Sequence, residues 1–184
     1  MKAFGFLSFG HYGGDPSRGG LSARQMLHDA VDIAVGADEL GVNNASFRVH
    51  HFAPQSAAPF PLLAAAAART QRIEVGTGVI DMRYENPLYL AEEAASLYQI
   101  SGGRVALGVS RGAPEVADRG WETFGYKGEA PNGADVARAH LEAFMAAVDG
   151  NGFATTAARA DTLLSNNLPL PKWARGDSAP RMWG

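Results

Sequence analysis

Short apolar runs alternate with longer amphipathic segments along the first 150 residues of the chain. The short runs are rich in β-branched and aromatic residues and are bounded by glycine or polar residues, which is typical of buried strands. The longer segments place apolar residues three or four positions apart, which predicts helices. The pattern predicts strands over 4–9, 44–49, 72–79 and 105–110, and helices over 21–40, 61–70, 87–100 and 135–148.

Residues typical of helix ends support these limits. Gly41 follows the first predicted helix at the position where a glycine commonly ends a helix. Asn86 and Pro87 supply an N-cap and a first-turn proline for the third helix, which is predicted to stop at Gly102. Each of the longer segments is therefore bounded by its own local signals.

Four strands that alternate with four helices predict a parallel sheet with helical crossovers. Two architectures fit: an open doubly wound sheet, and part of an eight-unit (β/α) barrel of the TIM type. Length favours the open sheet, because a complete barrel takes about 250 residues. Motifs favour the barrel, because the turn at 9–14 lacks the G-x-G-x-x-G spacing and no P-loop is present. About four of eight barrel units would then be present, as a partial barrel.

The segment 151–184 differs from the rest in being rich in proline, asparagine and arginine without a clear period. It predicts an irregular excursion and not a second domain, so residues 1–184 are expected to form a single domain. Residues 181–184 are expected to begin a fifth strand, at which the chain ends.

Composition and charge narrow the function classes. The chain is 46% hydrophobic and 19% charged with a net charge of −3, and no segment is loaded with lysine and arginine, so we expect no nucleic-acid partner. The absence of cysteine excludes disulfides, thiolate metal sites and cysteine nucleophiles. Without a signal-peptide pattern or an apolar stretch of about 20 residues, the sequence predicts a cytoplasmic protein with no membrane contact.

The pair His50-His51, at the end of the second predicted strand, is the first candidate for chemistry. An imidazole there can exchange protons or hold a developing anion. Adjacent strand residues point to opposite faces, so at most one of the two aims into a site. A metal site is not predicted, because no H-E-x-x-H or carboxylate spacing accompanies the pair. Two histidines in an ordinary loop are the alternative.

Two further strand ends carry glycines or a cation. The run 76–78 ends the third predicted strand, and glycines there permit the close approach of a flat ligand. The alternative is that they only form the turn that ends the strand. The run Ser110-Arg111-Gly112 ends the fourth, and its guanidinium suits a phosphate, with a surface ion pair as the alternative. Arg138, near a predicted helix start, is a weaker phosphate candidate.

Four separated segments resemble luciferase-like monooxygenases in order and spacing. They are 47–52, 73–79, 86–93 with Asn-Pro and Ala-Glu-Glu, and 101–112 with Ser-Gly-Gly-Arg and Gly-Val-Ser-Arg-Gly. The resemblance runs from about residue 1 to 150 and corresponds to the N-terminal half of the family's fold. It implies an eight-stranded α/β barrel that binds reduced FMN or a deazaflavin at its C-terminal rim.

The resemblance also implies roles for individual residues. His50 matches the family's catalytic histidine. Gly78 and Val79 match a pair often joined by a non-proline cis peptide against the flavin ring. Ser110 and Arg111 match flavin contacts, Arg111 through the phosphate. Less securely, Arg138 matches a second arginine on the phosphate side.

By the same resemblance, the expected reaction is insertion of one oxygen atom from O2 into a small organic substrate. The expected cofactor is reduced FMN, supplied by a separate NAD(P)H flavin reductase, with deazaflavin as the alternative. The double histidine favours the FMN branch. The expected assembly is a homodimer. The alternative function is a truncated, non-catalytic flavin-binding or scaffold half-barrel that needs a partner chain.

Overall fold

The computed structural model describes residues 3–112, 117–150, 154–155, 167–168 and 181–183. The strands are β1 (Gly5–Ser8), β2 (Asn44–Phe47), β3 (Glu74–Asp81), β4 (Val105–Ser110), β5 (Ala154–Thr155), β6 (Asn167–Leu168) and β7 (Arg181–Trp183). The α-helices are α1 (Ala23–Glu39), α2 (Pro59–Arg69), α3 (Pro87–Ser101) and α4 (Ala134–Val148), and the 3-10 helices are η1 (Pro16–Arg18) and η2 (Gly120–Phe124). The first four strands and all four α-helices correspond to predicted elements.

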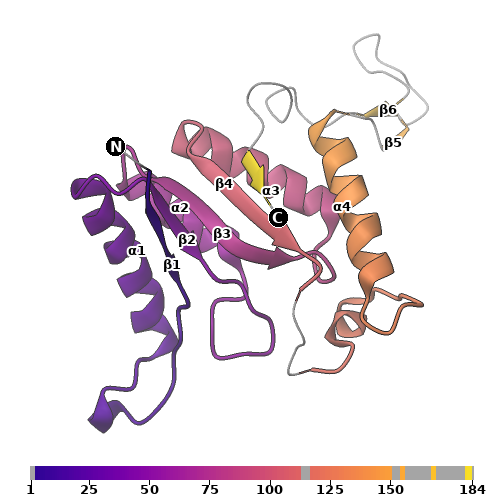
Figure 1. Cartoon of the computed structure of the whole chain (residues 1–184). Helices are drawn as coiled ribbons and strands as arrows, with labels where there is room; N and C mark the ends of the chain where they lie inside the picture. Colours follow the sequence, from indigo (N-terminus) through magenta and orange to yellow (C-terminus); the bar gives the residue numbers. More distant parts are fainter. Residues whose placement is uncertain (1–2, 113–116, 151–153, 156–166, 169–180, 184) are drawn as a thin grey trace.

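Five strands form one parallel sheet in the order β1-β2-β3-β4-β7 (Figure 1). Consecutive strands lie next to each other, as in a barrel that is laid down one βα unit at a time. The doubly wound alternative would instead reverse the strand order at a switch point. In the tail, β5 and β6 pair antiparallel, a short ladder that the irregular composition of this segment did not predict.

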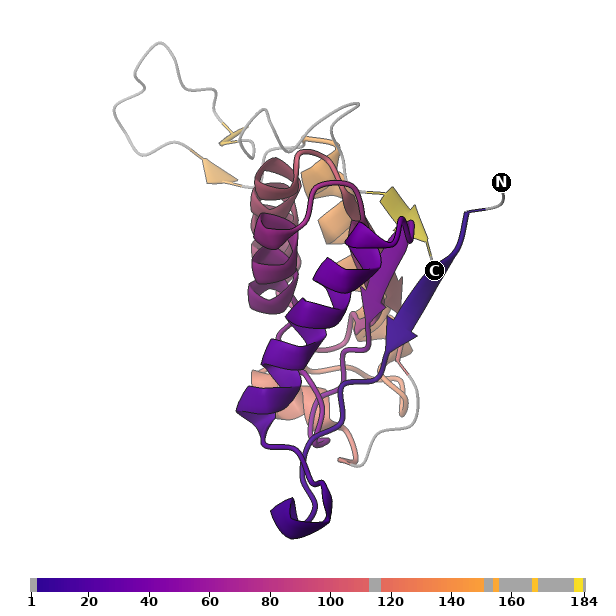
Figure 2. The ribbon, with the colours of Figure 1, turned by 90° about the vertical axis from the view of Figure 1, so that its left-hand side faces the viewer.

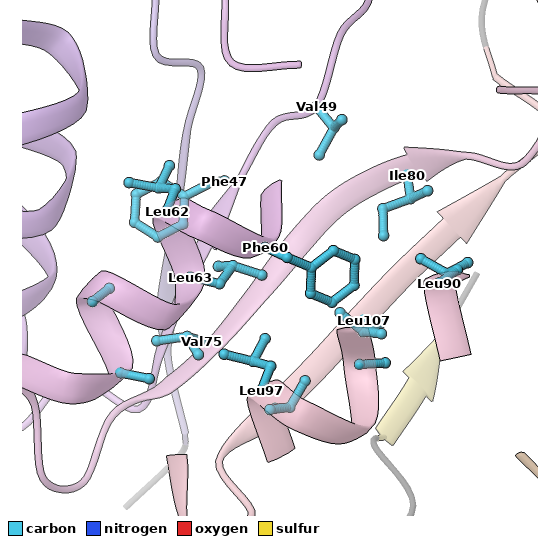
Figure 3. Packing of buried hydrophobic residues seen from close by; sticks show 14 of the residues in the cluster. Phe47, Val49, Phe60, Leu62, Leu63, Val75, Ile80, Leu90, Leu97 and Leu107 are labelled. Atoms are coloured by element: carbon cyan, nitrogen blue, oxygen red, sulfur yellow. The ribbon is translucent and has the colours of Figure 1, made fainter. Parts of the chain in front are cut away.

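Helices α1 to α4 lie on one face of the sheet (Figure 2). The core between the two layers contains Leu63 of α2 and Phe144 of α4, both fully buried. Figure 3 shows Leu63 in one cluster with the strand residues Val75 and Leu107. The opposite face carries Leu7, 44% exposed, and just beyond β1 Phe9, 47% exposed. This face corresponds to the inside of a barrel.

Local capping explains where two of the helices begin and end. The Asn86 side chain accepts hydrogen bonds from the backbone N–H groups of Leu88 and Tyr89, at 3.0 and 3.1 Å, which confirms the predicted N-cap of α3. Gly102 ends that helix with φ of 67°, a left-handed conformation that favours glycine. Ser22 accepts from Gln25 N at 3.1 Å and starts α1 two residues later than predicted.

Two polar networks fix the amino ends of β3 and β4. The Asp38 carboxylate accepts from the backbone N–H groups of residues 71, 72 and 73, which keeps its pKa below the usual value although burial acts in the opposite direction. The Arg104 guanidinium donates to Ile73 O and to Thr70 Oγ1, at 2.6 and 3.0 Å. Arg104, part of the Ser-Gly-Gly-Arg motif, therefore joins β3, β4 and the end of α2 at the edge opposite the predicted rim.

None of the helices within the described residues is long and apolar enough to cross a membrane.

Candidate functional site

A cavity of about 310 Å³ opens at the carboxyl ends of β2, β3 and β4. It is lined by Arg48, Val49, His50, Gly78, Val79, Asp81, Ser110 and Gly112. Four of the predicted site residues, from three strand ends, thus line one cavity: His50, Gly78, Val79 and Ser110. In a parallel α/β fold this is the edge at which ligands bind.

The end of β2 separates the two histidines as strand alternation predicts. Phe47 and Val49 are buried in the core, whereas Arg48 and His50 are only partly buried; Val49 also reaches the cavity, which Arg48 and His50 line. The His50 backbone N–H donates to Ser56 O at 3.0 Å, and its Nδ1 lies 2.9 Å from His51 O. These contacts hold the His50 ring at the cavity wall.

His51 turns away from the cavity into an aromatic cluster. Its ring centroid lies 4.4 Å from that of Tyr84 and 5.3 Å from that of Phe124. Burial lowers the pKa of His51, with a smaller opposing effect of the Asp81 charge, so the neutral imidazole is favoured. His51 therefore packs beside the site and does not line the cavity.

The wall formed by β3 and β4 is flat because it is built from glycines. The peptide bond between Gly78 and Val79 is cis, as the resemblance implied. A Cβ atom at Gly78 would lie 2.8 Å from Leu7 Cδ1, and one at Gly108 would lie 2.9 Å from Val79 Cγ1. These glycines let strands approach closely and leave backbone on the inner face. Such a surface fits a planar ring.

The predicted end of β3 was wrong. Pairing with β4 shifts register between Thr77 and Ile80 and then resumes, so the strand continues to Asp81 instead of ending at Val79. The extension brings Asp81 level with Ser110. Glycine spacing alone suggested a strand end, because a break within a strand carries the same residues as a turn.

A buried ion pair lies directly behind the cavity. The guanidinium Nε of Arg83 donates to both Asp81 oxygens, at 3.0 and 3.1 Å, and Nη2 lies 2.5 Å from Oδ2. The two side chains are 5% and 8% exposed. Arg83 also stacks over Trp121 at 4.8 Å and donates to Asn132 O at 3.2 Å. This pair joins the end of β3 to η2 and to the loop before α4.

Sequence reasoning missed three polar residues here: Arg48, Asp81 and Arg83. The signal available for Asp81 and Arg83 was their i, i+2 spacing directly after an apolar run. Such spacing is common on surfaces, and only the tertiary fold buries it. Arg48 carries no sequence signal of its own, because a single arginine beside a strand end is as typical of a solvated surface as of a site.

Two predicted cations do not line the cavity. Arg111 is exposed and follows Ser110 at its edge, whereas Arg138 is exposed on α4. Ser110 itself has a defined contact: its Oγ accepts from Gly112 N at 2.9 Å. The phosphate roles of Arg111 and Arg138 remain predictions.

Glu85 adds a titratable carboxyl group on the loop that follows the ion pair. Burial, with smaller contributions from the charges of Glu93 and Asp81, raises the pKa of Glu85 to about 7. Glu85 does not line the cavity. It therefore exchanges a proton near neutral pH next to the site and not within it.

A larger groove of about 670 Å³ lies between α1 and α2, on the helical face of the sheet. Its walls are mainly apolar, and they include Met26, Leu27 and Val31 of α1 and Leu62 of α2. None of the predicted site residues lines it. Size favours this groove, but the placement of the polar groups favours the smaller cavity at the strand ends.

The fold and the site define a class: a partial (β/α) barrel with a glycine-walled cavity at its C-terminal rim. The family model for luciferase-like monooxygenases matches residues 1–131. The chain therefore belongs to the luciferase-like monooxygenase family.

Curated relatives include both branches of flavin chemistry. Limonene 1,2-monooxygenase of Rhodococcus erythropolis is 32% identical over 117 residues, which cover 62% of this chain and 30% of the relative. An F420-dependent glucose-6-phosphate dehydrogenase of Nocardia farcinica is 39% identical over 112 residues, 56% of this chain and 31% of the relative. The family thus includes monooxygenases and deazaflavin-dependent dehydrogenases.

Among solved structures, the oxygenating constituent of 3,6-diketocamphane monooxygenase from Pseudomonas putida, in complex with FMN, superposes with a TM-score of 0.75. The superposition covers 98% of this chain and 50% of that one at 22% identity, which establishes a shared fold. The chain spans about half the length of the solved structure and less than half of the curated relatives.

Proposed function

We propose that this chain forms the flavin side of a luciferase-like, FMN-dependent monooxygenase that inserts one oxygen atom of O2 into a small organic substrate. The observation that supports this most is the cavity itself, in which the cis Gly78–Val79 wall faces the same space as His50 and Ser110. The wall is flat. The volume of the cavity, about 310 Å³, lies at the lower end of the range for ligand sites.

Each residue has a defined part in this proposal. The backbone at Gly78 and Val79 supports one face of the flavin ring, and Ser110 donates or accepts a hydrogen bond at its edge. His50 would hold or move a proton beside the ring, because its side chain lines the cavity and its Nδ1 is held 2.9 Å from His51 O. Reduced FMN, when bound, would supply the electrons that activate O2.

The proposal also includes the choice of cofactor, the partners and the location of the protein. The His50-His51 pair favours FMN, while the relative named as F420-dependent makes a deazaflavin the alternative cofactor. We further propose a separate NAD(P)H flavin reductase as the source of reduced FMN, a homodimeric assembly, and a cytoplasmic location. The second function, a non-catalytic flavin-binding or scaffold half, is kept because the chain spans about half of the FMN-bound relative.

Titration of the purified chain with reduced FMN, oxidised FMN and F420 tests this function. We expect saturable binding of reduced FMN, followed by fluorescence or calorimetry. If Arg111 holds the phosphate through charge-assisted hydrogen bonds, Arg111→Ala weakens FMN binding about 10- to 100-fold. Riboflavin, which lacks the phosphate, is the matched control and should bind wild type and variant alike.

Different results separate the alternatives. Preference for F420 over FMN would move the chain to the deazaflavin branch. Equal loss of riboflavin and FMN binding in Arg111→Ala would contradict a phosphate role. His50→Ala should leave folding and FMN affinity nearly unchanged, since His50 lies at the rim and is only half-buried. Absence of flavin binding by a folded chain would contradict the proposal.

A further inference from the structure

Arg48 is a cation in the wall of the candidate cavity that no carboxylate of the described residues neutralises. Its backbone N–H donates to Ser8 O at 2.9 Å, and its guanidinium lies over the Phe9 ring at 5.3 Å. Among the described residues, no acidic side chain makes an ion pair with it. Within the described part of the chain, the guanidinium of this cavity-lining residue has no hydrogen-bond acceptor or carboxylate partner.

Most of the other arginines in the described part of the chain differ in this respect. Arg83 is bound by the Asp81 carboxylate, Arg69 by Asp32 at 2.7 Å, and Arg104 by backbone oxygens. Arg111 and Arg138 are exposed, so water solvates them. Among the arginines that the structure describes, Arg48 is the one that combines partial burial and a place in the cavity wall with no ion pair to a described residue.

The charge of the cavity follows from these contacts. Asp81 also lines it, but both carboxylate oxygens are engaged by Arg83, so that pair contributes little net charge. Arg48 leaves the wall positive. A guanidinium that loses water when the cavity fills requires an anionic partner, because a desolvated charge without one is costly. The planar fork of donors suits a carboxylate or a phosphate.

Apolar surface adjoins this cation on the open face of the sheet. Phe9, over whose ring the Arg48 guanidinium lies, is 47% exposed, and Leu7 is 44% exposed. A ligand that engages Arg48 would therefore rest an apolar body on these side chains. The combination of one fixed cation and neighbouring apolar surface matches an amphipathic organic acid.

We propose that Arg48 binds the carboxylate of the substrate, so that the substrate class is an organic acid with an apolar body. The assignment rests on the proposed function, because it places the acid in the cavity shared with the flavin. Arg48 and His50 lie two residues apart just beyond the end of β2, and both line the cavity. A carboxylate held by Arg48 would thus fix the substrate beside His50.

Binding of benzoate and of benzamide, its neutral isostere, tests the proposal on the flavin-free chain. Each compound is titrated while the amide shifts of residues around Arg48 are followed by NMR. We expect benzoate to bind about 10- to 100-fold more tightly than benzamide, and Arg48→Met to remove that difference. Arg48→Lys should retain part of it. Arg69→Met, which removes an arginine already paired with Asp32, should change nothing.

Equal binding of benzoate and benzamide by wild type would overturn the assignment, and so would unchanged benzoate affinity in Arg48→Met. A third arm measures FMN and riboflavin with Arg48→Met. Because Arg48 lines the shared cavity, we expect any change to be equal for FMN and riboflavin, whereas a selective loss of FMN would assign Arg48 to the flavin phosphate and overturn the substrate role. Because the benzoate arm needs no flavin, failure of FMN binding and failure of the acid site are observed separately.

Discussion

Replacing Arg83 by methionine is expected to lower the free energy of unfolding by about 3–5 kcal/mol. The side chain of Asp81 is 8% exposed, and Arg83 satisfies both of its oxygens. Without the guanidinium, a buried carboxylate must either stay unpaired or take up a proton. Urea unfolding should show a lower midpoint with an unchanged slope.

Two control variants distinguish the cost of leaving a buried charge unpaired from the cost of losing an ion pair as such. The double variant Asp81→Asn, Arg83→Met should regain part of the loss, because neither partner then carries an unpaired charge. Arg69→Met breaks a pair whose side chains are 54% and 63% exposed, and should cost only about 0–1 kcal/mol. An Arg83→Met protein as stable as Arg69→Met would contradict the structural role of the buried pair.

Gly112→Ala is expected to destabilise the protein more than Gly125→Ala does. The two glycines have nearly equal φ, 86° and 88°, so an alanine pays a similar backbone cost of about 1–2 kcal/mol at either site. A Cβ atom at Gly125 meets open space, whereas one at Gly112 would overlap the Asp81 carboxylate. Overpacking against the ion pair adds about 1–3 kcal/mol.

Thermal or urea unfolding of the two glycine variants gives the comparison directly. Gly112 also lines the cavity, so its variant should additionally weaken FMN binding, which Gly125→Ala should leave unchanged. Equal stability of the two variants would mean that the loop at Gly112 moves freely away from the ion pair. That result would remove the argument that Asp81 and Arg83 shape the cavity wall.

The fold was largely predictable because its signals are local. Apolar runs and the caps at Asn86 and Gly102 placed the first four strands and the four helices within a few residues of their observed limits. The barrel-like strand order needed more than local pattern, and the motifs at the strand ends decided between the two architectures. The β5–β6 ladder was missed because two-residue strands carry no periodicity.

The site was predictable in part. His50, Gly78 and Ser110 were identified because unusual residues at the ends of parallel strands meet at one edge. The Asp81–Arg83 pair was not, since its importance comes from burial beneath Trp121 and Gly112, which lie far away in sequence. The candidate role of Arg48 likewise depends on its place in the cavity wall and on the absence of an ion pair with any described residue, which a sequence does not display.

Locating the FMN site from changes in backbone amide chemical shifts tests most directly the central claim that flavin binds in the cavity at the strand ends. Two-dimensional ¹H–¹⁵N NMR of the labelled protein, recorded with and without FMN, reports which residues the ligand approaches. The account predicts the largest shifts at Gly78, Val79, Ser110 and Gly112, at the rim of the sheet. Shifts confined to the apolar groove between α1 and α2, around Met26 and Leu62, would contradict it.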